Sequence, residues 1–593
     1  MFIIIKMRLL LSYILSALLA ILVMLPTAKA DLPSHCLKWQ VLGTWDFKLS
    51  QSQEEPALCG HTRPDDIVSV FLNNLGYENP GFTVSSTGTF KLLSNYSDEA
   101  ELCLENNCEK AKWTMVYDEG MAIKGIQTGL ELFVQFVYEP RGFVVREKSK
   151  TPDPKDPNKW KTFCDRTYPG WFGKGRNQRG CVVAKNRVPR PPQPSVSLLN
   201  DDGDNLIQMR SGLKMALQQS FKAEFMSQRT LNFDNLDEEV SLINKRQKFW
   251  VADASAASFA MGFTNKQTLS LFGGDREKLL KPKSYSLDNI IDPAERAKES
   301  ARRSCIRKVL PNSWDWATHE IGQTPVINQG NCGSCYAVSS LDAFTSRLRI
   351  KKNSTAFAAR SSRAVLQCSP TNQGCDGGFP WLVAHHAHYE GLYSETCAGP
   401  YTIGNPSPGS QLAECRFTTS ECTADREFAK DWGYVGGHYG RGNTEDMMWS
   451  LFRDGPLVVA INARSDLFMY RSGLFIANPP GAGDEVKVNE AYWEATTHAV
   501  TLVGWGSNQV EGHDVESWKI KNSWGENWGE RGYFHIQRGV DAMAVESMPV
   551  HAIFGDGKPG NPEFEAYVNN RLKELQDETC SDLIGKMLQK ELV

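Results

Sequence analysis

Apolar and polar positions divide the chain into stretches of different texture, and the first stretch is the most distinct. Residues 1–30 start with a basic flank and continue as an almost unbroken apolar run from Leu9 to Leu25. Ala28-Lys29-Ala30 then has the small-x-small form of a cleavage site. This pattern predicts a secretory signal peptide over residues 1–30, with Asp31 as the new N-terminus. The alternative is an uncleaved signal anchor, because the apolar run nearly reaches membrane-spanning length.

Residues 31–186 are predicted to form an all-β domain. Short alternating or β-branched runs occur at 81–84, 130–134 and 142–145, and Gly, Pro and Asn residues separate them. Such runs bounded by turn residues are typical of strands.

Residues 187–308 are predicted to be a linker followed by a mainly helical segment. Four prolines between residues 187 and 194 indicate an extended linker. Residues 237–260 mix charges with apolar residues at helical spacing. The polar, basic stretch that ends at Arg307-Lys308 has few apolar anchors, so we expect proteases to reach it.

The amino-acid composition changes again in residues 309–555, where Trp, Gly and Cys become frequent. The mixture of helical and strand patterns predicts an α+β domain. Residues 556–593 form a C-terminal extension with a helical pattern from Phe564 to Leu575.

Composition narrows the classes of function. The 593 residues include 65 Lys+Arg and 69 Asp+Glu, for a net charge of −4. This balance argues against a nucleic-acid partner that needs a broad basic surface. We expect no membrane association after signal cleavage, since no later run is long and apolar enough to span a bilayer.

The 15 cysteines are best explained by export, which makes disulfides the default state. An odd count leaves at least one cysteine without an intramolecular partner. Asn95-Tyr96-Ser97 and Asn353-Ser354-Thr355 are candidate glycosylation sites. We expect no metal site, because disulfides account for the cysteines better than zinc does.

The segment Gln329 to Tyr336 carries the first candidate chemistry. Residues 336–350 read as a helix, so Cys335 would lie at its N-terminus, where the helix dipole favours a thiolate. The Gln329 side chain could join the Cys335 backbone N–H in stabilising an oxyanion. A redox role for the Cys332-x-x-Cys335 pair is the alternative, but it would need neither Gln329 nor a distant base.

A base and its partner occur downstream in matching order. His498 precedes a strand-like run, and Asn522 follows 24 residues later within Asn522-Ser523-Trp524. An Asn oxygen can accept the imidazole N–H and fix its tautomer, and Trp524 can shield that hydrogen bond from water. The order Cys335, His498, Asn522 fits a nucleophilic triad.

These motifs resemble those of the papain-like cysteine proteases. Cys332 to Tyr336 fits the C-G-[SA]-C-[WY] signature, and Gly374 to Pro380 is a further family-like segment. Within the family, the closest resemblance is to the cathepsin C (dipeptidyl peptidase I) group. It rests on Asp31 to Cys36 followed by Leu42 to Trp45, and on Trp432 to Gly437.

The resemblance implies a multidomain architecture: an all-β exclusion domain, a mainly helical propeptide, and a papain-like domain with a helical half and a β-barrel-like half. It implies that Asp31 binds the free amine of the substrate. It also implies a chloride ion near the S2 subsite, held by the Tyr434 hydroxyl and by the backbone at Phe379 and Trp381. Position 381 is Trp where the animal proteins usually have Tyr, and this change retains a backbone donor. No organic cofactor is implied.

The resemblance also implies a set of disulfides. The pairs are Cys332–Cys375, Cys368–Cys415, Cys397–Cys422, Cys36–Cys164 and Cys59–Cys181. Cys103 and Cys108 are close enough in sequence for an additional local bridge. Cys305 falls in the segment expected to be removed and Cys580 in the tail, while Cys335 stays free as a nucleophile must.

The function expected from the sequence is therefore a cysteine exopeptidase that removes dipeptides from the free N-termini of peptides and proteins. The alternative is a papain-type endopeptidase with the same triad. An activating protease is expected to cut near residues 186–200 and 305–310, and a homo-oligomer is possible by resemblance. The expected location is the secretory pathway, with a lysosome or lysosome-like vacuole or the exterior as its end.

Overall fold

The computed structural model describes most of the chain from Cys36 onward. The described residues are 36, 38–54, 57–61, 73–93, 98–116, 119–140, 160–188, 193–194, 236–260, 293–402, 422, 424–463, 465–476 and 496–591. Asp31, Asn95, Cys415, the predicted signal peptide and the predicted strand at 142–145 lie outside them.

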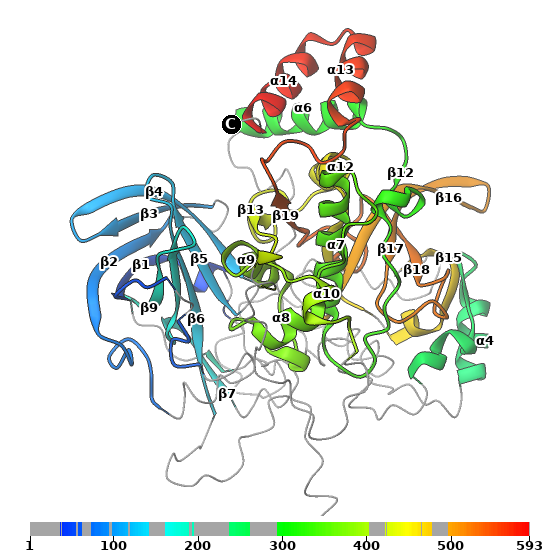
Figure 1. Cartoon of the computed structure of the whole chain (residues 1–593). Coiled ribbons are helices and arrows are strands. Elements are labelled where there is room, and N and C mark those ends of the chain that lie inside the picture. The colour runs from blue at the N-terminus through cyan, green and yellow to red at the C-terminus, as the bar shows by residue number, and fades with distance from the viewer. Residues whose placement is uncertain are drawn as a thin grey trace, which may run out of the picture.

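The N-terminal domain is a closed antiparallel barrel, drawn in blue and cyan in Figure 1. β1 pairs with β2 on one side and with β9 on the other, which closes a ring of strands. The ring runs in the order β1 (Gly43–Ser50), β2 (Val84–Leu92), β3 (Glu99–Leu104), β4 (Asn107–Val116), β5 (Gly120–Gly125), β6 (Leu130–Pro140), β8 (Gly170–Lys174) and β9 (Arg179–Asn186). β7 (Trp160–Thr167) and β10 (Gln193–Pro194) extend it, and η1 (Lys38–Gln40) precedes it.

Alternation along the strands explains the barrel. In β4, Ala111, Trp113 and Met115 are buried while Lys112 between them is exposed. Side chains on successive strand residues point to opposite faces, so this sequence places its apolar side inward. The all-β prediction is confirmed, although β2 begins at Val84 and residues 81–83 form a bend before it.

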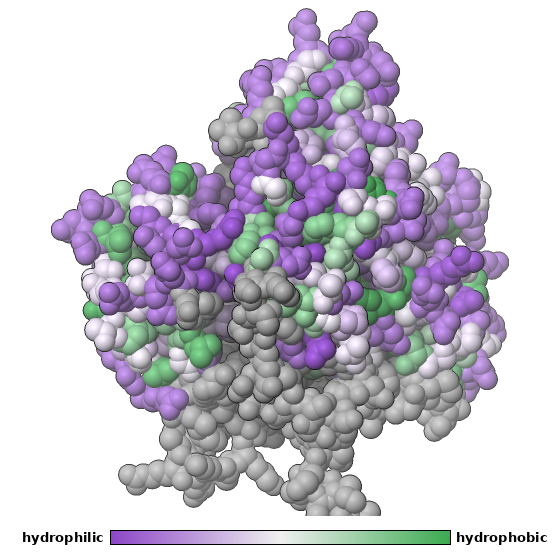
Figure 2. Space-filling view, viewed as in Figure 1, coloured by the Kyte–Doolittle hydropathy of each residue, from purple (hydrophilic) through white to green (hydrophobic). Residues whose placement is uncertain are grey.

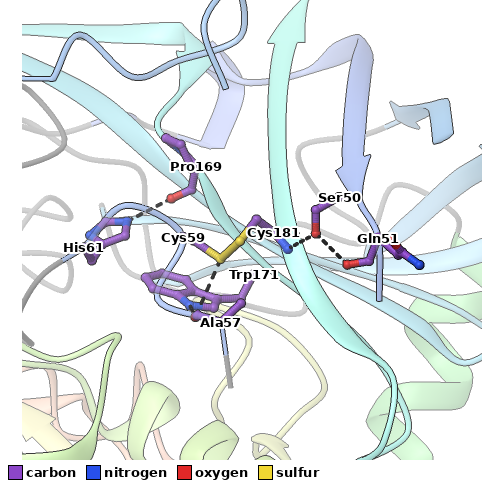
Figure 3. The surroundings of a disulfide bond; sticks show 8 residues. All are labelled: Ser50, Gln51, Ala57, Cys59, His61, Pro169, Trp171 and Cys181. Carbon is purple, nitrogen blue, oxygen red and sulfur yellow. Dashed lines mark hydrogen bonds between the residues drawn. A yellow bond between two sulfur atoms is a disulfide. The ribbon is translucent and has the colours of Figure 1, made fainter. Parts of the chain in front are cut away.

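A disulfide stabilises the barrel near the pairing of β1 with β9, which closes the ring of strands. Figure 3 shows the bridge between Cys59 and Cys181, with the Cys181 N–H donating to the Ser50 hydroxyl at 2.9 Å. The Trp171 indole N–H donates to the Ala57 carbonyl beside the bridge at 2.9 Å. The loop before β2 is thereby tied to β9 and β8.

The α+β domain has a helical half. Its helices are α7 (Cys335–Lys352), α8 (Ser362–Cys368), α9 (Pro380–Tyr389), α10 (Glu395–Ala398) and α12 (Thr444–Asp454). The central helix α7 is buried on nearly every side, from Cys335 to Ile350. A helix that is buried all round must lie in the middle of its domain, and α7 packs against both α9 and β16.

The other half of this domain is a twisted sheet, antiparallel except for the parallel pairing of β15 with β18. Its strands are β12 (Trp314–Asp315), β13 (Ala429–Tyr434), β14 (Leu457–Ile461), β15 (Tyr470–Phe475), β16 (His498–Val510), β17 (His513–Lys521), β18 (Tyr533–Gln537) and β19 (Val550–Phe554). Short 3-10 turns connect the elements at η6 (Trp316–Thr318), η7 (Glu320–Gly322), η8 (Gly374–Asp376), η9 (Ser465–Met469) and η10 (Ala542–Ala544).

The described parts of residues 187–308 lie at two separate places. α4 (Leu236–Arg246), β11 (Trp250–Ala252) and η4 (Ala254–Ala260) lie beside β15. The helical expectation for 237–260 is therefore right only in part, because β11 pairs with β15 as an added strand of the sheet. α6 (Pro293–Val309) lies under the C-terminal hairpin of α13 (Phe564–Leu575) and α14 (Glu578–Glu591), at the top of Figure 1.

The barrel and the α+β domain share one apolar core. Barrel residues such as Phe133 and α+β residues such as Trp381 belong to the same buried cluster. On the face shown in Figure 2 polar side chains predominate and apolar ones are scattered, as on ordinary protein surfaces. Over the described ranges, no helix has the length and hydropathy needed to cross a bilayer.

Candidate active site

Cys335 is the first residue of α7, as predicted, and a tight turn brings the chain to it. Gly333 donates its N–H to the Cys375 carbonyl at 2.8 Å. A Cβ at position 333 would lie 2.6 Å from that carbonyl oxygen, so only glycine fits there. Cys332 forms a disulfide with Cys375, and Cys335 is the free cysteine among the described residues.

Gln329 is fully buried beside this turn. Its side-chain amide donates to the Cys332 carbonyl at 3.0 Å, and its side-chain oxygen accepts from the Ser523 hydroxyl. An amide nitrogen carries two hydrogens, so the second one can be donated to an oxyanion next to Cys335.

His498 and Asn522 come together because they stand at the neighbouring ends of two paired strands. His498 begins β16, Asn522 follows β17, and Thr501 pairs with Lys521 between them. The His498 Nε2 and the Asn522 Oδ1 are 2.8 Å apart. Since an amide oxygen only accepts, Nε2 carries the hydrogen and the lone pair lies on Nδ1.

Trp524 covers the histidine with its ring. The two rings stack at 5.0 Å, and Phe468 stacks on the same indole at 4.8 Å. Phe259, from η4, stacks on Trp524 at 5.2 Å and on Phe468 at 5.6 Å. The predicted shield thus belongs to an aromatic cluster that also includes a residue of the 187–308 segment.

Burial controls the protonation of both reacting groups. It raises the pKa of the Cys335 thiol to about 11, against the opposing effect of backbone N–H groups that include those of Ala499 and Tyr336. Burial also lowers the pKa of His498 to about 4, although its hydrogen bond to Asn522 acts in the other direction. Both shifts are in the direction that favours the neutral forms of the thiol and the imidazole.

A pocket opens beside these groups. Cys335 and His498 lie on its wall together with the three residues expected around a chloride, Phe379, Trp381 and Tyr434. The Phe379 N–H already donates to the Asn372 side-chain oxygen at 2.8 Å. One of the backbone donors expected for a chloride is therefore already engaged within the protein, so the residues fit the expected anion only in part. In the described ranges, no group of three or more His, Cys, Asp or Glu is arranged to hold a metal ion.

The sequence did not single out the apolar part of this pocket. Ala460, Met548 and Val550 line it from β14, the loop after η10, and β19. These apolar residues belong to no recognisable catalytic motif, so only their position in the fold identifies them as pocket-lining residues.

The barrel packs directly behind the pocket wall. The ring centroids of Phe133, on β6, and Trp381 are 6.3 Å apart. The Tyr389 hydroxyl donates to Glu131 of the same strand at 3.2 Å, and Arg179 of β9 forms an ion pair with Glu390. Burial raises the pKa of Glu131 to about 7, with Lys124 and the Tyr389 hydroxyl opposing the shift.

The disulfides in the described residues follow the implied pattern and add one pair. The structure forms the bridges Cys36–Cys164, Cys59–Cys181, Cys103–Cys108, Cys332–Cys375, Cys397–Cys422 and Cys305–Cys580. Cys368 is also disulfide-bonded, while the expected partner Cys415 lies outside the described residues. Sequence spacing gave no signal for the Cys305–Cys580 pair, because its members are 275 residues apart.

Comparison with known families gives two matches to separate parts of the chain. Residues 310–553 match the papain family cysteine proteases, and residues 31–186 match the cathepsin C exclusion domain. The second match covers the barrel, and the first covers the domain that holds Cys335, His498 and Asn522.

Individual relatives agree with these matches. "Cathepsin C" of Schistosoma mansoni is 38% identical over 245 residues, which are 41% of this chain and 51% of that protein. The chain thus spans about half the length of this relative. "Dipeptidyl aminopeptidase 1" of Plasmodium falciparum is 25% identical over 90% of this chain and 95% of that protein. Bovine "Pro-cathepsin H" is 31% identical over 40% of this chain and 64% of that protein.

The two family matches do not overlap, and the structure packs the matched regions against each other at the pocket wall. Residues 310–553 therefore form a protease domain of the papain family, and residues 31–186 form a cathepsin C exclusion domain.

Proposed function

We propose that the protein is a cysteine exopeptidase that removes dipeptides from free N-termini. The observation that carries this proposal is the contact between Phe133 of the barrel and Trp381 of the pocket. A substrate seated with its scissile carbonyl at Cys335 would extend toward this wall, and a wall at fixed distance rejects longer chains. The groove of an endopeptidase would have to stay open at that end.

Acylation would start with transfer of the Cys335 proton to the lone pair of His498 Nδ1. The thiolate attacks the carbonyl carbon after the second residue, and the C=O electron pair moves to the oxygen. The Gln329 side-chain amide and the Cys335 backbone N–H stabilise that oxyanion. When the tetrahedral intermediate collapses, His498 gives its proton to the leaving amine and a thioester remains.

Deacylation would use the same groups with water as the nucleophile. Neutral His498 accepts a proton from water, the hydroxide attacks the thioester carbonyl, and the oxyanion forms again between Gln329 and Cys335. Collapse releases the dipeptide and returns the proton to the sulfur. Asn522 keeps the His498 ring in the one tautomer that both steps need.

Recognition of the substrate amine is proposed for Asp31, which lies outside the described residues. A carboxylate paired with an ammonium would fix the N-terminus two residues from the scissile bond. A chloride held by Tyr434 and the Trp381 N–H would place a negative charge at the pocket wall and complete it.

Maturation and localisation of the enzyme also follow from this proposed function. The segment of residues 187–308 would act as a propeptide that an activating protease cuts. Its η4 already covers the aromatic cluster around Trp524 through Phe259. The apolar leader and the disulfides support a location in the secretory pathway, in a lysosome-like compartment or outside the cell.

The test compares a free-amine dipeptidyl fluorogenic amide with its N-acetyl twin, using processed enzyme and a Cys335→Ala control. The free-amine substrate should be cut and the acetylated one should not. Removal of chloride should weaken cleavage, since it would open the pocket wall. Equal cleavage of both substrates would show that the barrel does not close the groove, and would favour the endopeptidase.

A further inference from the structure

Tyr401 lies in the chain after α10, outside the motifs that carry the triad, and its hydroxyl reaches the active-site turn. It donates to the Gln329 backbone carbonyl at 2.8 Å and lies 2.6 Å from the Ser334 hydroxyl. A phenol has one hydrogen, so the Ser334 hydroxyl must be the donor in the second contact. A chain of hydrogen bonds therefore runs from Ser334 through Tyr401 to Gln329.

Ser334 has an unusual role at the start of α7. It is the N-cap residue, yet its side chain makes no capping hydrogen bond, because its hydroxyl is directed to Tyr401. A capping hydroxyl would ordinarily accept from the N–H groups of the first turn. Ser334 instead accepts through its backbone carbonyl, from the Ala337 and Val338 N–H groups at 3.0 and 2.9 Å.

The Tyr401 hydroxyl thus contacts both sides of the oxyanion site. Gln329 supplies the side-chain donor, and Ser334 directly precedes Cys335, which supplies the backbone donor. Burial raises the pKa of Tyr401 well above its ordinary value, so the hydroxyl keeps its hydrogen at any working pH. A fixed phenol at this point sets the separation between the two donors.

We propose that Tyr401 is a positioning residue for the oxyanion hole, acting through Gln329 and Ser334. The proposal rests on the proposed acyl-transfer function. Preorganised donors supply a large part of the rate enhancement in acyl transfer, and small displacements weaken them. Tyr401 touches no substrate atom in this role.

The test is the variant Tyr401→Phe, which keeps the ring and removes only the hydroxyl. We expect kcat on the free-amine substrate to fall about tenfold with little change in KM. Affinity for a peptide aldehyde should fall by a similar factor, because the hemithioacetal places an oxyanion between the same donors. The rate of Cys335 alkylation by iodoacetamide should stay within about twofold, because displacement of iodide forms no oxyanion.

Tyr567→Phe on α13 is the matched control, since it removes a phenol hydroxyl far from the pocket. If Tyr401→Phe does not fold, Ser334→Ala is the alternative variant, because it removes no capping hydrogen bond. It should likewise lower kcat and leave the rate of Cys335 alkylation nearly unchanged. Unchanged kcat, or equal losses of kcat and alkylation rate, would overturn the proposal. An inactive wild-type enzyme would count against the proposed function instead.

A second and independent observation concerns α6 and the C-terminal hairpin. Cys305 of α6 and Cys580 of α14 form a disulfide in which both residues are buried. The family match ends at residue 553, so the hairpin of α13 and α14 lies beyond it. Figure 1 shows this hairpin packed over α6.

Further contacts hold α6 from two sides. Arg302 forms an ion pair with Asp446 of α12 at 2.6 Å, and Lys308 pairs with Asp577 before α14 at 2.9 Å. Ile306 and Val309 are fully buried in the same core as Phe564 of α13. The peptide bonds between 305 and 310 are therefore helical or buried and not in the extended form that proteases bind.

We infer that α6 stays in the processed enzyme as the third helix of a cap with α13 and α14, covalently held by Cys305–Cys580. The expected removal of the segment up to residue 308 would then apply only to chain that precedes α6. A cut between 305 and 310 would still leave Cys305 attached to Cys580.

In the test, a thiol-reactive peptide probe captures active enzyme through Cys335 in the absence of reductant. The captured enzyme is washed with urea, and its remaining peptides are mapped by mass spectrometry. Residues 293–309 should be present in equal amount with the protease domain and linked to Cys580, whereas residues 236–260 should be depleted. In a Cys580→Ser variant, α6 should detach from the cap, so that the bonds between 305 and 310 become open to the activating protease and α6 is lost in urea. A Cys103→Ser/Cys108→Ser variant should keep α6. Absence of α6 from the wild-type enzyme, or a free Cys580 thiol, would overturn the inference.

Discussion

Two pieces of the same intervening segment are attached to the protease domain in opposite ways. The piece with η4 is held by an added strand and by aromatic stacking of Phe259 on Trp524. The piece that forms α6 is held by a disulfide and by ion pairs. Stacking and strand pairing are reversible, but a disulfide holds its two residues together until it is reduced. If the segment is cut as proposed, the piece with η4 can leave and the piece that forms α6 cannot.

Removal of the Cys305–Cys580 disulfide should weaken the attachment of α6 more than any other change. Cys305→Ser with Cys580→Ser should lower the free energy of opening the cap by about 2–5 kcal/mol, because the bridge closes a very long loop of the unfolded chain. Amide hydrogen exchange in α13 and α14 measures this free energy. Cys103→Ser with Cys108→Ser serves as the control, since it opens a loop with a sequence separation of only 5. A loss below about 1 kcal/mol in the cap would contradict the covalent role of the bridge.

The second prediction weakens the reversible piece. Phe259→Ala in the unprocessed chain should reduce the docking free energy of η4 by about 2 kcal/mol, because a half-buried ring leaves the stack with Trp524 and Phe468. The rate at which iodoacetamide alkylates Cys335 in that chain should rise about tenfold or more. Val251→Ala is the matched control, since Val251 lies in β11 and is exposed. If the Phe259 variant reacts no faster than this control, η4 does not guard the site.

The stability of the cap around α6 should depend weakly on pH, whereas the docking of η4 should vary less. Burial alone would raise the pKa of Glu299, but its hydrogen bonds and charge attraction to Arg302 and Arg303 outweigh it and lower the pKa to about 2. The folded-state pKa is depressed, so this stabilisation is fully present above about pH 4.5 and is lost as pH falls toward 2. Glu299→Gln should cost about 1 kcal/mol or less at pH 7, after allowance for solvent screening, and nothing near pH 2.

Cap stability of wild type and Glu299→Gln, followed by amide exchange from pH 7 to pH 2, checks this prediction. The two curves should converge in acid. Parallel curves would mean that the ion pairs of α6 contribute nothing that depends on pH. The aromatic contacts of Phe259 with Trp524 and Phe468 involve no titratable group, so its docking should vary less with pH.

Much of the active site followed from local sequence. Cys335 begins a helix because Gly333 permits the tight turn before it. His498 and Asn522 each stand in a short distinctive context at the end of a strand, and strand pairing then brings them together. Residues whose role depends on a motif could be named before the fold was known.

Other residues could not be named, because their roles depend on contacts between distant parts of the chain. Tyr401 carries no motif, and its meaning comes from reaching Gln329 and Ser334. The helical pattern at 237–260 missed β11, because pairing with β15 overrides local propensity.

Local spacing and periodicity were enough to predict a triad of Cys335, His498 and Asn522, the β character of the first domain and the helical character of α7. The folded structure was needed to show that Cys305 pairs with Cys580, that Phe133 packs behind Trp381, and that burial shifts the pKa values of Cys335 and His498 toward their neutral forms. Disulfide pairing, packing and desolvation depend on distance in space, which sequence separation does not give.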